Sequence, residues 1–104
     1  MNININNNLK IEIDKIINLY KQKNFRDALI LSNKVIEKDK NIPFLLNLNG
    51  LINLSLEKWH NAIFAFKKAL DADDKFVEAY NNIGVAYSHI GDDKKAVENY
   101  TLAI

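Results

Sequence analysis

The chain has 104 residues, with 14 Lys and Arg against 13 Asp and Glu, no Cys, and 48% hydrophobic residues. That length suits one domain, and a net charge of +1 removes the usual electrostatic argument for binding nucleic acid or an anionic membrane surface. Without cysteine there can be no disulfide framework, thiolate zinc site or cysteine nucleophile.

The chain opens with an Asn-rich stretch, residues 1–8, which reads MNININNN. Such a low-complexity stretch is expected to be a flexible lead-in to the folded part. It lacks the basic and apolar regions of a signal peptide, and no stretch of the sequence reaches the roughly 18 consecutive apolar residues of a membrane span. We therefore expect a cytoplasmic protein.

From residue 9 onward, apolar residues recur with a period near 3.6, which is the spacing of an amphipathic helix. Pro43 suits the first turn of a helix, where its missing N–H is not needed. Gly91 suits a helix C-terminus, and Asp92 suits the N-cap that follows it. With the polar breaks between apolar stretches, these signals predict an all-α fold of three antiparallel helix pairs, at residues 9–22, 25–38, 43–56, 59–72, 77–90 and 93–104.

The sequence also repeats itself with an offset of 34 residues. Small residues align with small ones and large with large: Gly50 with Gly84, Ala62 with Ala96, Phe66 with Tyr100, and Ala69 with Ala103. One further offset toward the N-terminus places Ile16 at the Gly position and Ser32 at the aromatic position. If these two positions face each other, a large-for-small change is offset by a small-for-large one, which protein cores tolerate.

A helix–turn–helix unit of 34 residues with these small and large positions resembles the tetratricopeptide repeat (TPR). The best match is the stretch from Ala79 to Tyr87, followed by Gly91, Asp92, Ala96, Tyr100 and Ala103. The resemblance implies a right-handed α-solenoid, a TPR-like superhelix, over residues 9–104. Its repeats would be residues 9–42, 43–76 and 77–104, of which the first is degenerate and the third truncated.

The resemblance also implies a binding surface, because the first helix of each pair lines the concave groove of such a superhelix. Family partners, usually extended or helical peptides, lie in that groove. Carried over to this sequence, the candidate groove residues are Ile13, Ile17, Phe44, Asn47, Leu48, Leu51, Glu78, Asn81, Asn82, Val85 and His89. For Phe44, Leu48 and Leu51, core packing is the competing interpretation.

The asparagines of this surface are suited to peptide binding, because a side-chain amide can form hydrogen bonds with a peptide backbone of any sequence. Asn82 stands where the TPR segments of O-linked GlcNAc transferases carry a ladder of Asn, but Asp14 and Leu48 interrupt that ladder here. The chain is rich in Asn, Ile and Lys, all encoded by AT-rich codons, so genome composition is a second explanation for its asparagines.

The carboxylate clamp by which some family members hold chaperone tails is not expected in this chain. The cationic and amide positions of that clamp are occupied here by Ile13, Ile17, Leu48, Glu78 and Asn82. A ligand carboxylate would therefore face apolar groups and an acid.

The sequence carries no pattern typical of catalysis or of metal binding. His60 and His89 lie in different repeats without a carboxylate at metal-ligand spacing, which favours solvated helix histidines. Asp71, Asp73 and Asp74 resemble a calcium loop only faintly, because the Gly and the Glu of such a loop are missing. No Gly-rich phosphate loop or nucleophile elbow occurs. We expect no enzyme activity, cofactor or metal.

Three functions stay open. The leading hypothesis is a non-catalytic protein–protein interaction scaffold that binds a peptide or partner helix in the concave groove. The alternative is the N-terminal, substrate-recruiting arm of a larger transferase-type enzyme, because the sequence stops at Ile104 within what should be a longer final helix. The third is self-association as a homodimer through the third repeat, with an exposed apolar edge expected at Ala79, Ala86, Val97, Tyr100 and Ile104.

Overall fold

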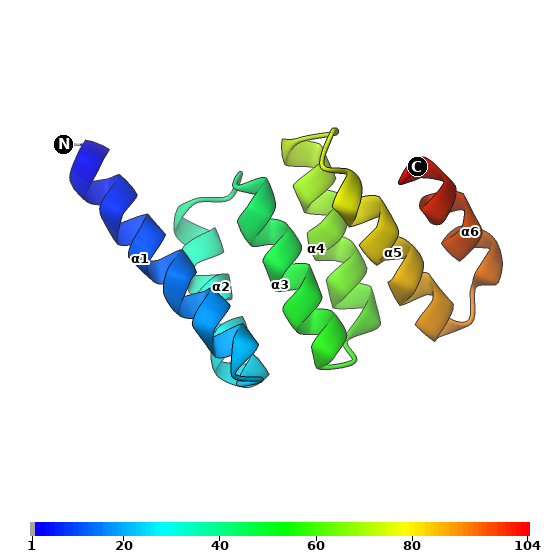
Figure 1. The fold of residues 1–104 in the computed structure, drawn as a ribbon, viewed down its shortest axis with the longest axis horizontal. Coiled ribbons are helices and arrows are strands. Elements are labelled where there is room, and N and C mark those ends of the chain that lie inside the picture. Colours follow the sequence, from blue (N-terminus) through cyan, green and yellow to red (C-terminus); the bar gives the residue numbers. More distant parts are fainter. Residues whose placement is uncertain (1) are drawn as a thin grey trace.

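The computed structural model describes residues 2–104, and for residues 2–6 it describes the backbone alone. Over that range the chain forms six α-helices and no strand (Figure 1). The helices are α1 (Asn2–Lys21), α2 (Phe25–Lys38), α3 (Pro43–Ser55), α4 (Trp59–Ala72), α5 (Val77–Ile90) and α6 (Asp93–Leu102). The predicted all-α fold and its six helices are therefore confirmed.

Most helix ends lie where the sequence signals place them. Pro43 is the first residue of α3, and the Asp92 side chain accepts a hydrogen bond of 3.1 Å from the Lys95 backbone N–H as the N-cap of α6. The exception is α1, which begins at Asn2, so that residues 2–8 are helical where a flexible lead-in was expected. No Gly or Pro interrupts this segment, and extending an existing helix is far easier than nucleating one. Met1 lies outside the described residues.

The turns within the three helix pairs share one backbone design. Each has a single residue with positive φ, at Lys23 (61°), Glu57 (59°) and Gly91 (94°), and these positions are related by the repeat offset. In each turn the next N–H donates to a carbonyl of the preceding helix, for example from Asp92 to Tyr87 at 2.9 Å. This is the Schellman arrangement, in which glycine is the favoured residue at the left-handed position.

We expect Glu57→Gly to raise the free energy of unfolding by about 0.5–1 kcal/mol, because a side chain in the left-handed region is strained and glycine is not. The midpoint of denaturant unfolding measures this change. Gly91→Ala at the equivalent turn is the reciprocal control and should lower the midpoint, since only φ opposes a side chain there: a Cβ would meet no atom within 4 Å. A lower midpoint for Glu57→Gly would contradict this account of the turns.

The helices stack in chain order into an elongated solenoid with extents of 47 × 27 × 19 Å (Figure 1). Each helix packs against its neighbours in sequence, and α3 also contacts α5. None of the described helices is long and apolar enough to cross a membrane.

The core is built from the small and large positions of the repeat. A Cβ atom added to Gly50 would overlap the Phe66 ring, and one added to Gly84 would lie 2.7 Å from the Tyr100 ring, so each glycine faces its aromatic partner directly. In the first repeat Ile16 and Ser32 hold the equivalent positions, and both are fully buried. Ser32 donates to the Leu29 carbonyl and accepts from Asn49, so the smaller residue is also hydrogen-bonded.

Two of the residues expected at the exposed C-terminal edge belong to this core instead. Ala79 and Ala86 are fully buried, in one cluster with Ile63, Phe66 and Ile83. Both alanines share this cluster with residues of α4, so they contribute to the packing of α5 against α4. The prediction that Ala79 and Ala86 form part of an exposed edge was wrong.

Candidate functional site

The predicted groove residues lie on α1, α3 and α5, but they differ widely in exposure. Phe44, Glu78, Asn81 and His89 are exposed, and Ile13, Ile17, Leu51, Asn82 and Val85 are partly buried. Asn47 and Leu48 are buried. Nine of these side chains are therefore at least partly exposed to solvent, whereas Asn47 and Leu48 are not.

Leu48 is buried because it packs into the hydrophobic core. It belongs to a core cluster with Ile16, Leu45 and Ile52, and its side chain closes the contact between the first two helix pairs. The prediction that Leu48 faces a ligand was wrong, and the competing interpretation of core packing holds for this residue.

Asn47 is buried and forms a hydrogen bond within the protein. It is only 4% exposed, and its Oδ1 accepts a hydrogen bond of 3.0 Å from Asn82 Nδ2. The contact joins α3 to α5, which are first helices of successive pairs. Both side-chain amides were expected to hydrogen-bond a peptide backbone. In the structure, each uses one of its hydrogen-bonding groups on the other.

This pair yields a stability prediction. Asn82→Ala leaves the buried Asn47 oxygen without its partner and should lower the free energy of unfolding by about 1–3 kcal/mol. Adding Asn47→Ala to that variant should cost less than Asn47→Ala costs alone, because the partner is already gone. Thermal melts of the two single variants and the double variant measure the coupling. Strictly additive effects would contradict a hydrogen bond between the two side chains.

A hollow of about 440 Å³ lies where α1, α3 and α5 approach the start of α4. Three predicted groove residues, Leu51, Val85 and His89, line it together with Tyr20, Leu54 and Trp59. The Trp59 and His89 rings stack with centroids 4.3 Å apart and an interplanar angle of 5°. The hollow therefore combines aliphatic walls with a flat aromatic pair, a surface suited to apolar side chains of a peptide.

Trp59 was missed by the sequence analysis because it is the first residue of α4, a second helix of its pair. A position in the groove is not expected of such a residue. The available signal was that Trp59 is the sole tryptophan of the chain and lies at a turn, not at a core position of the repeat.

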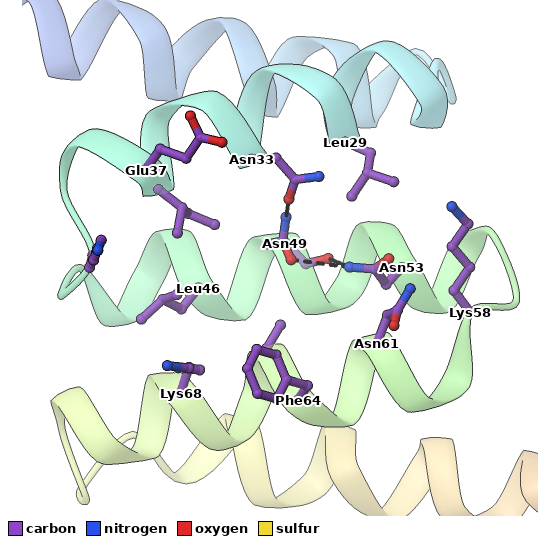
Figure 2. Close-up of a pocket in the computed structure, with 13 residues that line it drawn as sticks. Leu29, Asn33, Glu37, Leu46, Asn49, Asn53, Lys58, Asn61, Phe64 and Lys68 are labelled. Atoms are coloured by element: carbon purple, nitrogen blue, oxygen red, sulfur yellow. Dashed lines mark hydrogen bonds between the residues drawn. The ribbon is translucent and has the colours of Figure 1, made fainter.

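A second hollow, of about 540 Å³, lies between α2 and α4 with α3 at its floor (Figure 2). We call it the α2–α4 groove. Its floor includes Leu46, Asn49 and Asn53 of α3, and Lys40, Lys58 and Lys68 stand around it. Sequence reasoning did not identify this site, because nothing in the repeat pattern marks the space between two second helices.

At the C-terminal end of the solenoid, Val97 is 62% exposed and Ile104 is fully exposed. Tyr100 is partly buried over Gly84, as the repeat pattern predicts. Val77, Tyr100 and Ile104 line a shallow depression between α5 and α6. Among the described residues, no group of three or more His, Cys, Asp or Glu side chains is arranged to hold a metal ion.

Residues 65–98 match the sequence model of a known family, described as Tetratricopeptide repeat. A curated relative, the probable UDP-N-acetylglucosamine–peptide N-acetylglucosaminyltransferase SEC of Arabidopsis thaliana, is 33% identical over 86 residues. The aligned part is 83% of this chain but only 9% of the transferase, so the chain spans a small part of that relative's length.

Two solved structures show the same fold at low identity. The translocator chaperone SycD of the Yersinia enterocolitica type III secretion system, in an alternative dimer, superposes with a TM-score of 0.91 at 15% identity, covering 93% of this chain and 74% of SycD. The second TPR of Spaghetti (RPAP3), bound to the HSP90 peptide SRMEEVD, superposes with a TM-score of 0.86 at 18% identity, covering 91% of this chain and 88% of that one.

Proposed function

The chain is a tetratricopeptide-repeat protein, and we propose that it is a non-catalytic interaction scaffold that binds a peptide or partner helix on the surface of α1, α3 and α5. The observation that carries the proposal is the hollow at Leu51, Val85 and His89, because predicted groove residues from two repeats meet there beside the stacked Trp59 ring. The structural neighbour with a bound HSP90 peptide supports peptide binding as the mode of action.

The ligand of this surface should present apolar side chains, not a C-terminal carboxylate. Of the positions that form a carboxylate clamp, Leu48 is buried, Ile13 and Ile17 are apolar, and Glu78 is an exposed acid. The hollow offers Leu51, Leu54 and Val85 instead. Burial of one Leu or Phe side chain there would contribute about 1.5–3 kcal/mol.

The lone tryptophan supplies a direct readout. Peptides selected from a random library on the immobilised chain are titrated into it while the emission of Trp59 is followed. We expect saturable emission changes, and the double variant Leu51→Ala, Val85→Ala should weaken binding at least about tenfold through lost apolar contact. Ile11→Ala with Ile30→Ala, two exposed residues away from the hollow, is the matched control. Selected peptides that ignore the Leu51 and Val85 substitutions would refute the proposed site.

A second candidate function is the substrate-recruiting arm of a transferase-type enzyme. The observation that favours it is the 33% identity to a segment of the SEC transferase. In this case the same surface would hold the polypeptide substrate, and catalysis would belong to another part of the protein. Sequencing the gene on both sides of the region encoding these residues distinguishes the two functions: an adjoining transferase domain supports the arm, and its absence supports the free scaffold.

Self-association through the third repeat is a further part of the proposal. It is supported by the exposed Val97 and Ile104 of the C-terminal edge and by the dimeric form of SycD. We expect sedimentation to detect a dimer at high concentration, and Val97→Lys should shift it to monomer by placing a charge in the contact. Ile30→Lys, on an equally exposed apolar residue of α2, should leave the dimer intact. A wild-type chain that is monomeric at about millimolar concentration would refute self-association through the C-terminal edge.

A further inference from the structure

The floor of the α2–α4 groove contains a hydrogen-bonded network of polar side chains, of which Ser32, Asn49 and Asn53 are buried. Asn49 Nδ2 donates to Ser32 Oγ at 2.8 Å. It also donates to Asn33 Oδ1 at 2.9 Å (Figure 2). Asn53 Nδ2 donates to the Asn49 carbonyl at 3.0 Å and to Asn49 Oδ1 at 3.1 Å. The hydrogen bonds of Asn49 to Ser32 and Asn33 link α3 to α2 at the floor of the groove.

The network also decides which polar groups remain for a ligand. Asn33 uses one lone pair of its Oδ1 to accept from Asn49, and its Nδ2 can donate to a ligand. Across the groove Asn61 is an exposed residue of α4 with a second amide. Three ammonium groups, those of Lys40, Lys58 and Lys68, add further donors. Glu37 is the single acidic residue of the lining, so the rim is rich in donors and net positive.

The same groove exposes apolar surface. Phe64 is 65% exposed, and Lys68 Nζ stands 5.2 Å from the centre of its ring. Leu29, Ile36 and Leu46 supply further apolar lining. Phe64 therefore provides an exposed aromatic face at the edge of the hollow, on which apolar side chains of a partner can pack.

We propose that the α2–α4 groove binds an acidic amphipathic segment of a partner protein, independently of the surface formed by α1, α3 and α5. The apolar side chains of that segment pack on Phe64 and on the partly exposed Leu29 and Ile36. Its carboxylates face Lys40, Lys58, Lys68 and the donor group of Asn33. Charge complementarity selects this occupant, because a rim with three cations and one anion repels a basic segment. Nucleic acid is disfavoured as the occupant because the whole chain carries a charge of only +1.

The test uses fluorescein-labelled peptides of about 14 residues, or four helical turns, with Leu and Phe on one face and Glu on the other. A matched peptide carries Lys in place of every Glu, and binding is followed by fluorescence anisotropy. We expect the acidic peptide to bind, its affinity to fall as salt is raised, and the basic peptide not to bind. Equal binding of the two peptides, or tighter binding of a single-stranded oligonucleotide in the same assay, would overturn the proposal.

Two pairs of variants locate the peptide on the molecule. The triple variant Lys40→Glu, Lys58→Glu, Lys68→Glu should weaken binding of the acidic peptide at least about tenfold. The triple variant Lys15→Glu, Lys21→Glu, Lys94→Glu has the same net charge, changes exposed lysines on α1 and α6, and should weaken it less than about threefold. Similarly, Phe64→Ala should weaken binding while Ile30→Ala, at an exposed apolar residue of α2 outside the groove lining, should not.

If the two triple lysine variants weaken peptide binding equally, the attraction is general and electrostatic. That result would overturn the proposal that the peptide binds in the α2–α4 groove. A second copy of the chain is the other occupant to distinguish. If the wild-type chain sediments as a dimer and the Lys40, Lys58, Lys68 triple variant as a monomer, the groove holds another copy and the peptide proposal is wrong. All six lysines are exposed, so circular dichroism should confirm that both triples keep the fold.

Discussion

Gly50→Leu is expected to lower the free energy of unfolding by about 3 kcal/mol or more, because there is no space for its side chain. Even a Cβ atom at this position would overlap three atoms of the Phe66 ring. Phe66 of α4 is fully buried in a cluster with residues of α3 and α5, so its ring has no space to move into. The variant must either push α3 away from α4 or force both side chains out of their preferred rotamers.

Gly84→Leu is the informative comparison for this prediction. A Cβ atom there would lie 2.7 Å from the Tyr100 ring, but Tyr100 is only partly buried and belongs to the last helix. The ring can turn toward solvent, so the loss should be smaller, about 1–2 kcal/mol. Urea unfolding followed by circular dichroism ranks the two variants. A Gly50→Leu chain as stable as wild type would contradict the close contact between α3 and α4. Equal losses would contradict the argument that Tyr100 can move and Phe66 cannot.

Ile16→Gly is expected to lower the free energy of unfolding by about 3–5 kcal/mol, although glycine is the residue of the other two repeats at this position. Ile16 is fully buried in the cluster with Leu45, Leu48 and Ile52. The position equivalent to the aromatic holds Ser32, which is tied to Asn49, so no large side chain can fill the space that Ile16 would vacate.

The matched control is Ile11→Gly, on the same helix. Ile11 is 61% exposed, so this variant carries the helix cost of glycine, about 1 kcal/mol, with little loss of packing. The difference between the two midpoints isolates the packing of Ile16. A difference below about 1 kcal/mol would mean that the first repeat does not use Ile16 as the structure places it.

The fold could be predicted from the sequence because its determinants are local and repeated. Pro43 and Gly91 mark helix ends through their backbone conformation, and Asp92 does so through its side-chain cap. The offset of 34 residues pairs each small residue with a large one. At the N-terminal end, α1 begins at Asn2, where a flexible lead-in was expected. Asn-rich composition is a weak local signal, whereas the continuation of a helix is cooperative.

The candidate site could be predicted only in part, because it depends on how each helix is rotated. Helical spacing grouped Leu51, Val85 and His89 on one predicted surface, and the structure places all three around one hollow. The same spacing could not tell that Leu48 and Asn47 turn toward neighbouring helices, since a rotation of a few tens of degrees separates a groove position from a core position. The α2–α4 groove depends on the distance between two helices that are not consecutive, and no sequence period records that distance.

The most direct test of the central claim is an amide NMR titration of the chain with a library-selected peptide. If the chain is a scaffold that uses α1, α3 and α5, the largest shifts should cluster around Leu51, Val85 and His89 and include the indole N–H of Trp59. Asn33, Asn61 and Phe64, on the α2–α4 groove, should stay unchanged with such a peptide. Shifts confined to α2 and α4, or no shifts with any selected peptide, would contradict the claim.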